Sequence, residues 1–508
     1  MKFERTKNSS RIFFFGMINK ICVTLLPFVT RTIIIYKLGR DYLGLTTLFT
    51  SVLSMLNMSE LGIGSAIAFC MYKPVAEDDK RAVCALMNLM RKLYKLIGFS
   101  ILGIGLILMP FIKNFINGEY PADTNIYLLY LIYLANSCVS YLLFAYKNTL
   151  LEVYQRGDVI QKLSTIVEVC KYGVQIIVLL FFENFYLFAA VLPIAQIITN
   201  CWVNIKSKQL YPDITPTGSV PKEMATVIRK KVGYLAAQSI TSTFTNSIDN
   251  IVISASISLS AVAIYGNYSY ITSAVLSFVM IAYSALKSSV GNAIYTEGNE
   301  RNLELFKSLR FLSWWAATVC SACMICMFQP FIELWVGAEN LLPFSAVLMI
   351  VIYFYTNCSR QFLTMNYIGT AGLWDKTLLR QILITIVNLI LDISLAPKWG
   401  VTGIVFASFF THAIIGLPMD IYVVYRYVLK TPGMKGVLGE AINYVLAGFI
   451  LGTTLLFTTL IHVSGVAELF AAAVCAVSIP NLIIIAVFHK KKEFVFVVDH
   501  IKMLIKKT

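Results

Sequence analysis

Apolar residues recur along this chain in runs long enough to cross a lipid bilayer, and polar connections separate the runs. A hydrocarbon core of about 30 Å needs about 20 apolar residues at a rise of 1.5 Å per residue. The pattern predicts about fourteen membrane-spanning helices, at residues 12–36, 42–72, 94–117, 125–147, 161–182, 184–205, 232–256, 262–286, 308–332, 341–365, 376–396, 400–425, 437–461 and 465–488. We therefore expect an all-α polytopic membrane protein.

Composition supports this fold class. Of the 508 residues, 58% are hydrophobic and 14% are charged, which leaves too little polar surface for a soluble chain of this length. The longest connections, near residues 206–231 and 287–307, are too short to build a core of their own. We expect no soluble domain.

The basic residues predict an orientation. Counted by connection, 35 of the 42 Lys and Arg residues lie on the side of the N-terminus, and only Lys37, Arg40, Lys113 and Lys398 lie on the other side. This asymmetry follows the positive-inside rule and predicts a cell-membrane protein with both termini in the cytoplasm. It also accounts for the formal net charge of +15 without a nucleic-acid partner, because basic loops contact anionic lipid headgroups.

The chain also shows a weak internal repeat. Residues 42–51 match residues 264–273 in pattern, so that Gly44 corresponds to Gly266, and the stretch from Gly157 echoes the one from Gly372. We interpret these matches as two parallel six-helix units, residues 1–210 and 225–430, followed by two additional helices at 437–488 and a basic tail at 489–508. The alternative is a chance likeness of two apolar patterns. Parallel repeats are common in transporters, which bind substrate between them.

Three basic residues, Lys20, Arg31 and Lys171, remain inside the predicted spans once the others are assigned to connections. A cation near the bilayer centre costs roughly 2.5–3.5 kcal/mol, so it usually faces a bundle interior or a hydrated cavity. Lys20, Pro27 and Arg31 share one helical face, and Pro27 should bend the helix between the two cations. For Arg31, the alternative is that it reaches outward to the membrane surface.

Acidic and amide residues form similar stripes. Glu168 lies three residues before Lys171 and can pair with it on one face, while Asp392 lies one turn after Asn388 in the eleventh span. Asp249 follows a polar stripe in the seventh span, and Glu60 lies midway along the second. The alternative reading of all these stripes is that they only hold helices together by hydrogen bonds.

The chain carries no motif for covalent chemistry. It has no phosphate-binding loop, dinucleotide fingerprint, nucleophile elbow or metalloprotease motif. Cys320, Cys323 and Cys326 have apolar flanks and no His nearby, which favours membrane packing over a metal site. We expect no enzyme activity, no cofactor and no metal site.

Six segments carry a recognisable pattern, namely residues 38–45, 59–67, 72–74, 249–250, 265–268 and 372–376, with Asn388 downstream. They resemble the polysaccharide flippases of the multidrug, oligosaccharidyl-lipid and polysaccharide exporter superfamily. The resemblance implies two six-helix lobes in a V shape that move by alternating access. It also implies a substrate, an oligosaccharide on a polyprenyl diphosphate, carried from the inner to the outer leaflet of a bacterial membrane for polysaccharide assembly.

The predicted site residues fit this substrate. Lys20, Arg31 and Lys171 could compensate the diphosphate charge, with Asn388 among the groups for sugar hydroxyls. Four carboxylates are then candidates for ion pairing or for coupling to H⁺ or Na⁺, namely Glu60, Glu168, Asp249 and Asp392. Besides membrane lipids and the lipid-linked oligosaccharide, a polymerase or glycosyltransferase of the same synthesis machinery is a candidate partner.

Other functions stay open at this point. A multidrug or organic-cation antiporter would share the fold, but its cavity should be acidic on balance. A lipid II flippase also carries a diphosphate and has extra terminal helices. A polysaccharide polymerase or ligase would need a sizeable outward loop with reactive residues, and the outward connections here are short. A scaffold role leaves the aligned intramembrane charges unexplained.

Overall fold

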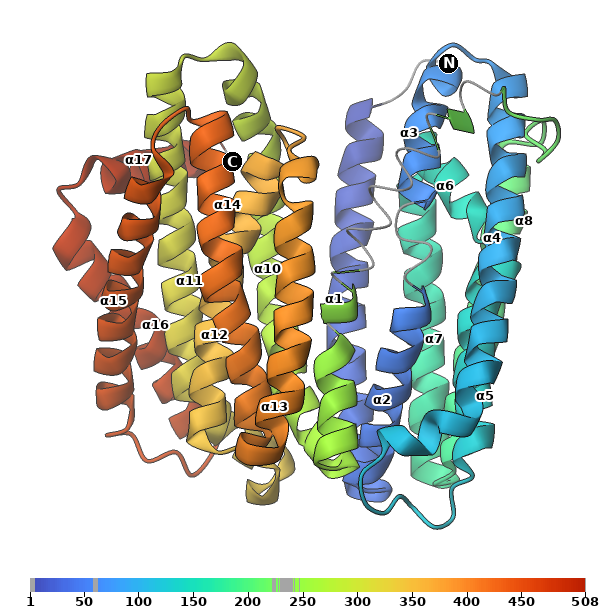
Figure 1. The fold of residues 1–508 in the computed structure, drawn as a ribbon, viewed down its shortest axis with the longest axis horizontal. Helices are drawn as coiled ribbons and strands as arrows, with labels where there is room; N and C mark the ends of the chain where they lie inside the picture. The colour runs from blue at the N-terminus through green and yellow to red at the C-terminus, as the bar shows by residue number, and fades with distance from the viewer. Residues whose placement is uncertain are drawn as a thin grey trace. The chain divides into compact units, whose positions relative to one another are not determined.

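The computed structural model describes residues 5–57, 63–221 and 247–507, together with residues 225, 226, 228, 241 and 243–245. All regular elements within these ranges are helical. The residues fall into two compact units, Met1–Ala263 and Ile264–Thr508. Each unit is described below by itself (Figure 1).

Unit 1 is a bundle of long helices joined by short connections. Its described elements are α1 (Arg5–Lys37), α2 (Arg40–Leu56), α3 (Ile63–Ala76), α4 (Lys80–Leu108), η2 (Met109–Phe115), α5 (Ile126–Leu142), α6 (Tyr146–Val153), α7 (Gly157–Phe181) and α8 (Phe185–Leu210). Polar side chains cap the N-termini of several of these helices. Asp79, Asn125 and Asn184 accept hydrogen bonds from free backbone N–H groups in the first turns of α4, α5 and α8, respectively.

Aromatic side chains fill the centre of unit 1. Phe49 packs edge to face against Tyr130 and Tyr133, and all three side chains are buried. Tyr130 donates a hydrogen bond to the carbonyl of Gly105 at 3.0 Å, and Tyr133 donates to Thr46 at 3.2 Å. Because each buried hydroxyl has a partner, these tyrosines join α2, α4 and α5 without leaving a polar group unsatisfied.

Unit 2 has longer helices. Its elements are α10 (Leu259–Thr296), which begins at the end of unit 1, α11 (Asn299–Val336), η3 (Ala338–Asn340), α12 (Phe344–Leu363), η4 (Thr364–Ile368), η5 (Trp374–Lys376), α13 (Leu378–Phe410), η6 (Thr411–Gly416), α14 (Leu417–Val423), η7 (Val424–Val428), α15 (Gly433–Thr458), α16 (Val466–Phe488) and α17 (Lys492–Lys507). Helices α15 and α16 pack against each other and against α11 (Figure 1).

Helix α13 is two helices that meet at Gly400. This glycine has φ 57° and ψ −140°, a conformation that residues with a Cβ rarely adopt. A Cβ on Gly403 would lie 2.8 Å from the carbonyl oxygen of Leu395, so the two arms approach closely. Asn388 donates a hydrogen bond to Ser408, twenty residues further on, at 3.2 Å. The chain therefore reverses direction at Gly400, as the two predicted spans 376–396 and 400–425 require.

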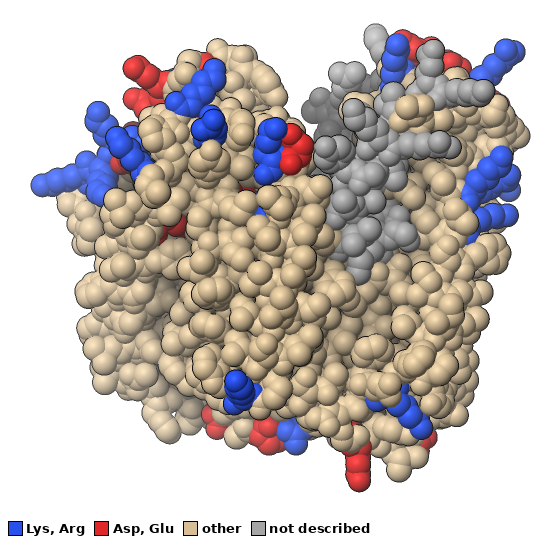
Figure 2. Space-filling view, in the orientation of Figure 1, with Lys and Arg blue, Asp and Glu red and all other residues tan. Residues whose placement is uncertain are grey.

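The surface is that of a multi-pass membrane protein. Eight described helices are long and apolar enough to span a membrane, or nine if α5 and α6, which are bent by 46°, count as one span. One of the eight is the stretch Trp374–Val428, which contains the reversal at Gly400 and so crosses twice. Figure 2 shows uncharged residues over the flank of each unit, with Lys and Arg gathered mainly at one end.

The predicted fold class is confirmed as an all-helical membrane protein. Every predicted span overlaps described helical residues. In the span 232–256 these include residues 247–256, whereas most of its first half lies outside the described residues. The predicted span 42–72 is described as α2 and α3. The basic tail contains α17, whose Phe494 stacks on Trp315 of α11 at 5.5 Å between ring centroids.

Candidate functional site

Helices α1 and α7 are parallel neighbours in a fixed register. Asn19 donates a hydrogen bond to Thr165 at 3.0 Å, and Lys37 pairs with Glu183 at 2.7 Å. Both pairs are 146 residues apart in sequence. Because the separation is the same near the two ends of the helix pair, residues of α1 lie level with residues 146 positions later in α7.

This register places the three predicted cations at successive levels. Lys171 lies level with Leu25, between Lys20 and Arg31. At 1.5 Å per residue, its backbone is roughly 7.5 Å from the level of Lys20 and roughly 9 Å from that of Arg31. All three side chains are half-buried. The fold thus brings the three predicted cations onto one pair of adjacent helices.

Lys171 forms an ion pair with Glu168 one turn earlier on α7. The side chains are 11% and 26% exposed, respectively, so the pair is neither fully buried nor at the surface. The Lys171 ammonium also lies over the ring of Tyr172, 4.3 Å from its centroid. Glu168 and Tyr172 together offset the cost of a lysine at this depth.

Gln175, a turn beyond Lys171, has a different role. It is buried, and its Nε2 donates to the carbonyl of Phe188 on α8 at 3.2 Å. Gln175 thus joins α7 to α8. The residue is an example of an amide that holds helices together, the alternative considered for the polar stripes.

A polar cavity of about 650 Å³ lies inside unit 1. Among its described lining residues there is one carboxylate, Glu152, and no Lys or Arg. The polar lining consists of Ser65, Tyr72, Tyr94, Ser140, Asn148, Thr149, Glu152, Gln196 and Asn200. Gln196 donates to Asn200 at 3.1 Å, whereas the buried Oδ1 of Asn148 has no hydrogen-bond partner among the described residues. Sequence analysis did not single out these side chains, which come from five different helices.

The acidic candidates differ in their surroundings. In unit 2, Asp392 and Asn388 are fully buried, and Asn388 donates to Ser408 across the hairpin. In unit 1, Asp249 is buried, and the next residue, Asn250, donates to Ser51 of α2 at 3.0 Å. Glu60 lies outside the described residues. Asn388 and Asp392 are therefore brought together within unit 2, on one face of α13.

Unit 2 also contains buried charges within helices, although the sequence analysis above placed their arginines in connections. Arg310 of α11 pairs with Glu440 of α15, and it donates to the carbonyl of Ser359 at 3.1 Å. Arg360 of α12 and Arg380 of α13 both pair with Asp420 of α14. The prediction that only Lys20, Arg31 and Lys171 lie within helices was therefore wrong. Asp420 and Glu440 fell inside predicted spans, and the three arginines fell within five residues of the ends of theirs, so the predicted spans already contained both members of each ion pair.

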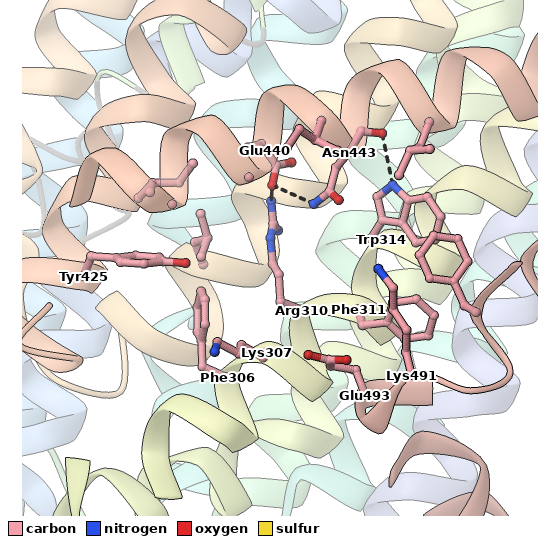
Figure 3. Close-up of a pocket in the computed structure, with 17 residues that line it drawn as sticks. Phe306, Lys307, Arg310, Phe311, Trp314, Tyr425, Glu440, Asn443, Lys491 and Glu493 are labelled. Atoms are coloured by element: carbon pink, nitrogen blue, oxygen red, sulfur yellow. Dashed lines mark hydrogen bonds and ion pairs between the residues drawn. The ribbon is translucent and has the colours of Figure 1, made fainter. Parts of the chain in front are cut away.

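The Arg310–Glu440 pair forms part of the wall of a second cavity, of about 330 Å³ (Figure 3). Arg310 points from α11 toward Glu440, Asn443 donates to Glu440 at 3.4 Å, and Trp314 donates to the carbonyl of Asn443 at 3.1 Å. Lys307, Lys491 and Glu493 also line this cavity. It lies among α11, α12, α14, η7, α15, the end of α16 and the start of α17.

No family model matches the sequence, and no curated protein matches it in sequence. Solved structures do match the fold. Lipid II flippase MurJ in an inward closed conformation matches with a TM-score of 0.65 at 14% identity, over 94% of this chain and 99% of its own. An inward-facing multidrug resistance MATE family transporter of the MOP superfamily matches with a TM-score of 0.63 at 15% identity, over 80% and 95%.

The chain has the fold shared by MATE transporters and MurJ. The Vibrio cholerae MATE transporter VcmN also matches, with a TM-score of 0.58 at 13% identity, over 84% of this chain and 98% of its own. At these identities the likeness establishes the transporter fold and leaves the substrate open.

Proposed function

We propose that the chain is a flippase, which carries an oligosaccharide linked to a polyprenyl diphosphate from the inner to the outer leaflet of a bacterial cell membrane. The single observation that carries this proposal is the placement of Lys20, Lys171 and Arg31 at three levels along two parallel helices of unit 1. A diphosphate is an anion that must cross a medium of low dielectric, and successive cations lower that barrier at each level.

Lys171 takes the central role in this mechanism. In the structure its ammonium pairs with Glu168. An arriving phosphate oxygen would replace the Glu168 carboxylate as its partner, so the lysine stays compensated before, during and after the passage. Lys20 would receive the diphosphate on the side of the N-terminus, and Arg31 would release it near the opposite surface. No bond forms or breaks in this cycle, so the proposed activity is transport alone.

The polar cavity of unit 1 suits the sugar. Amides, hydroxyls and one carboxylate can exchange hydrogen bonds with sugar hydroxyls, and Tyr72 and Tyr94 supply flat apolar faces. Because its described lining holds no Lys or Arg, it is better suited to a neutral glycan than to the diphosphate. We propose that the two regions of unit 1 divide the substrate between them.

Coupling to an ion is proposed at Asp392 with Asn388, with Asp249 as a second acidic candidate. Asn388 and Asp392 offer carboxylate and amide oxygens within a fully buried region of unit 2. A proton or Na⁺ bound there would neutralise the carboxylate, and its release in the other conformation would make the transport cycle directional. The basic end of each unit would face the cytoplasm, with both termini on that side.

Lipid II is the second candidate substrate. The match to the lipid II flippase extends over 94% of this chain, against 80–84% for the MATE transporters cited above, as expected if α15 and α16 have counterparts in it. Both candidate lipids carry a diphosphate, so the cations do not distinguish them. A multidrug antiporter of MATE type is the third candidate.

The test is the leaflet location of glycolipid in spheroplasts of the native host, with and without this gene. A lectin that cannot cross the membrane reports the oligosaccharide exposed on the outer leaflet. We expect deletion to trap intact lipid-linked oligosaccharide on the inner leaflet, and a plasmid copy to restore it. Trapping of lipid II would favour the second candidate, and an unchanged distribution of both lipids in a strain without paralogues would favour the antiporter.

A further inference from the structure

The cavity between α11 and the additional helices α15 and α16 has the features of a lipid-headgroup site. Its interior contains a nearly buried ion pair, since Arg310 and Glu440 are only 11% and 6% exposed. Glu440 Oε1 has no hydrogen-bond partner among the described residues. A carboxylate oxygen that is buried at the wall of a cavity and lacks a donor favours a ligand that brings a hydroxyl or another donor.

The charges at the cavity are matched to an anion. Arg310 is neutralised by Glu440, which leaves Lys307 and Lys491 against Glu493 (Figure 3). Lys307 and Lys491 are both exposed; Lys307 lies on α11, and Lys491 lies in the connection between α16 and α17. One excess positive charge suits a phosphodiester, which carries a single negative charge.

Basic and aromatic side chains alternate along the α11 wall of the cavity. Relative to Lys307, Arg310 lies one turn deeper, by about 4.5 Å, and Trp314 lies about 10.5 Å deeper. Phe311 and Trp314 pack against Phe488 of α16, with ring centroids 5.4 and 5.3 Å away. The Lys491 ammonium lies 4.7 Å from the centroid of the Phe488 ring. A phosphate at Lys491 would therefore place the glycerol and acyl carbons of a phospholipid beside these rings.

The surrounding surface identifies the source of the ligand. Leu438, Ile442 and Val445 of α15 and Val487 of α16 are exposed on the flank of unit 2, where an uncharged surface faces the bilayer. A cavity of about 330 Å³ is at the small end of ligand pockets. It can hold a headgroup and the adjoining glycerol, while the chains lie against the exposed apolar residues.

We propose that this cavity binds the headgroup of an anionic phospholipid with free hydroxyls, of the phosphatidylglycerol type. The phosphodiester pairs with Lys307 and Lys491, and a headgroup hydroxyl donates to Glu440 Oε1. The bound lipid joins α11 to α15 and to the start of α17, and so stabilises the additional helices on unit 2. This site is separate from the proposed path of the transported lipid in unit 1.

Gly439 provides the test, because a Cβ at this position in the cavity wall would meet nothing within 4 Å. The Cβ of Gly439→Leu would meet no neighbour, and its longer side chain should occupy part of the cavity. Gly448 of the same helix is exposed and also has open space around its Cβ position, so Gly448→Leu is the matched control. Purified full-length protein would be titrated with phosphatidylglycerol and phosphatidylcholine, with binding read by native mass spectrometry and by thermal unfolding.

We expect the wild type and Gly448→Leu to prefer phosphatidylglycerol, and Gly439→Leu to lose that preference. A Lys307→Ala/Lys491→Ala variant should bind phosphatidylglycerol about tenfold more weakly or worse, and it keeps the proposal testable if Gly439→Leu fails to fold. Equal binding of both lipids to the wild type, or unchanged preference in both cavity variants, would overturn the proposal. Stabilisation by millimolar inorganic phosphate equal to that by the lipid would assign the site to a free anion and likewise overturn it.

Discussion

Arg360 Nε lies 3.0 Å from Asp420 Oδ2 inside unit 2, and the same carboxylate also pairs with Arg380. Asp420 is fully buried, and both arginines are less than 10% exposed. The three side chains come from α12, α13 and α14, so one carboxylate holds three helices together. Gly416 allows this approach, because a Cβ there would lie 2.6 Å from Arg360 Nε.

Asp420→Asn should destabilise the protein strongly, because it leaves two arginines buried without an anion. Removing one partner of a buried ion pair costs about 3–5 kcal/mol. Arg380→Met should cost much less, since it leaves one cation with one anion. Thermal unfolding of the purified variants measures both effects, and an Asp420→Asn protein as stable as Arg380→Met would contradict this account.

Lys171→Ala should abolish flipping while expression stays normal. The variant removes the central cation of unit 1, and a diphosphate at that level would lose its compensating charge. Lys37→Ala is the control, because it also removes a lysine from an ion pair on these two helices. The Lys37 and Glu183 side chains of that pair are 42% and 53% exposed, respectively. The lectin assay measures both, and full activity of Lys171→Ala would remove this residue from the substrate path.

Glu168→Gln should leave the diphosphate lipid bound more tightly and release it more slowly. The substitution removes the carboxylate that competes for Lys171, so the lysine loses its alternative partner. Binding of undecaprenyl diphosphate to purified protein checks this expectation. If Glu168→Gln binds the lipid more weakly than the wild type, the carboxylate does not act as the competitor proposed here.

Asp392→Asn should remove the dependence of transport on an ion gradient. The amide keeps the shape of the side chain but does not take up a proton or hold Na⁺ as a carboxylate does. Ser394→Ala is a nearby control, since its exposed hydroxyl donates to the carbonyl of Ile390 within the same helix. Transport in proteoliposomes under imposed pH or Na⁺ gradients separates the two variants, and a gradient response retained by Asp392→Asn would exclude coupling at this residue.

Gly400→Ala should destabilise unit 2 by about 1–3 kcal/mol, because its backbone conformation is strained for any residue with a Cβ. Gly448→Ala lies mid-helix with open space around the new methyl group, and should be neutral or stabilising by up to about 1 kcal/mol. Thermal unfolding of the two purified variants measures the difference in their stability. Equal stability of the two variants would mean that the reversal does not depend on a glycine.

The spans could be predicted because the bilayer imposes a length on every apolar run, and α15 and α16 begin and end close to the predicted residues 437–461 and 465–488. The burial of the arginines in unit 2 could not be predicted in this way. Arg360 and Arg380 lie within a few residues of helix ends, where a sequence cannot separate a loop charge from a buried one. Their partner Asp420 is 60 and 40 residues away in sequence, and only the folded chain brings the three together.

The register between α1 and α7 was also beyond the sequence. Lys20 and Lys171 were predicted as separate intramembrane cations, and nothing in their spacing shows that their helices are parallel neighbours. The polar cavity of unit 1 could not be predicted from the sequence for a similar reason. Its polar side chains come from α3, α4, α5, α6 and α8, and within each helix they do not differ from other polar residues of the chain.

The pairing of α1 with α7 has a consequence for biosynthesis. Helix α1 ends at Lys37 and α7 ends at Phe181, so the ribosome must add 144 further residues before the second helix is complete. At about 5–20 residues per second, this takes roughly 7–30 s. During that interval Lys20 and Arg31 enter the bilayer without their eventual neighbour. The hydrogen bond of Asn19 to Thr165 and the ion pair of Lys37 with Glu183 can therefore form only after α1 has waited through this interval.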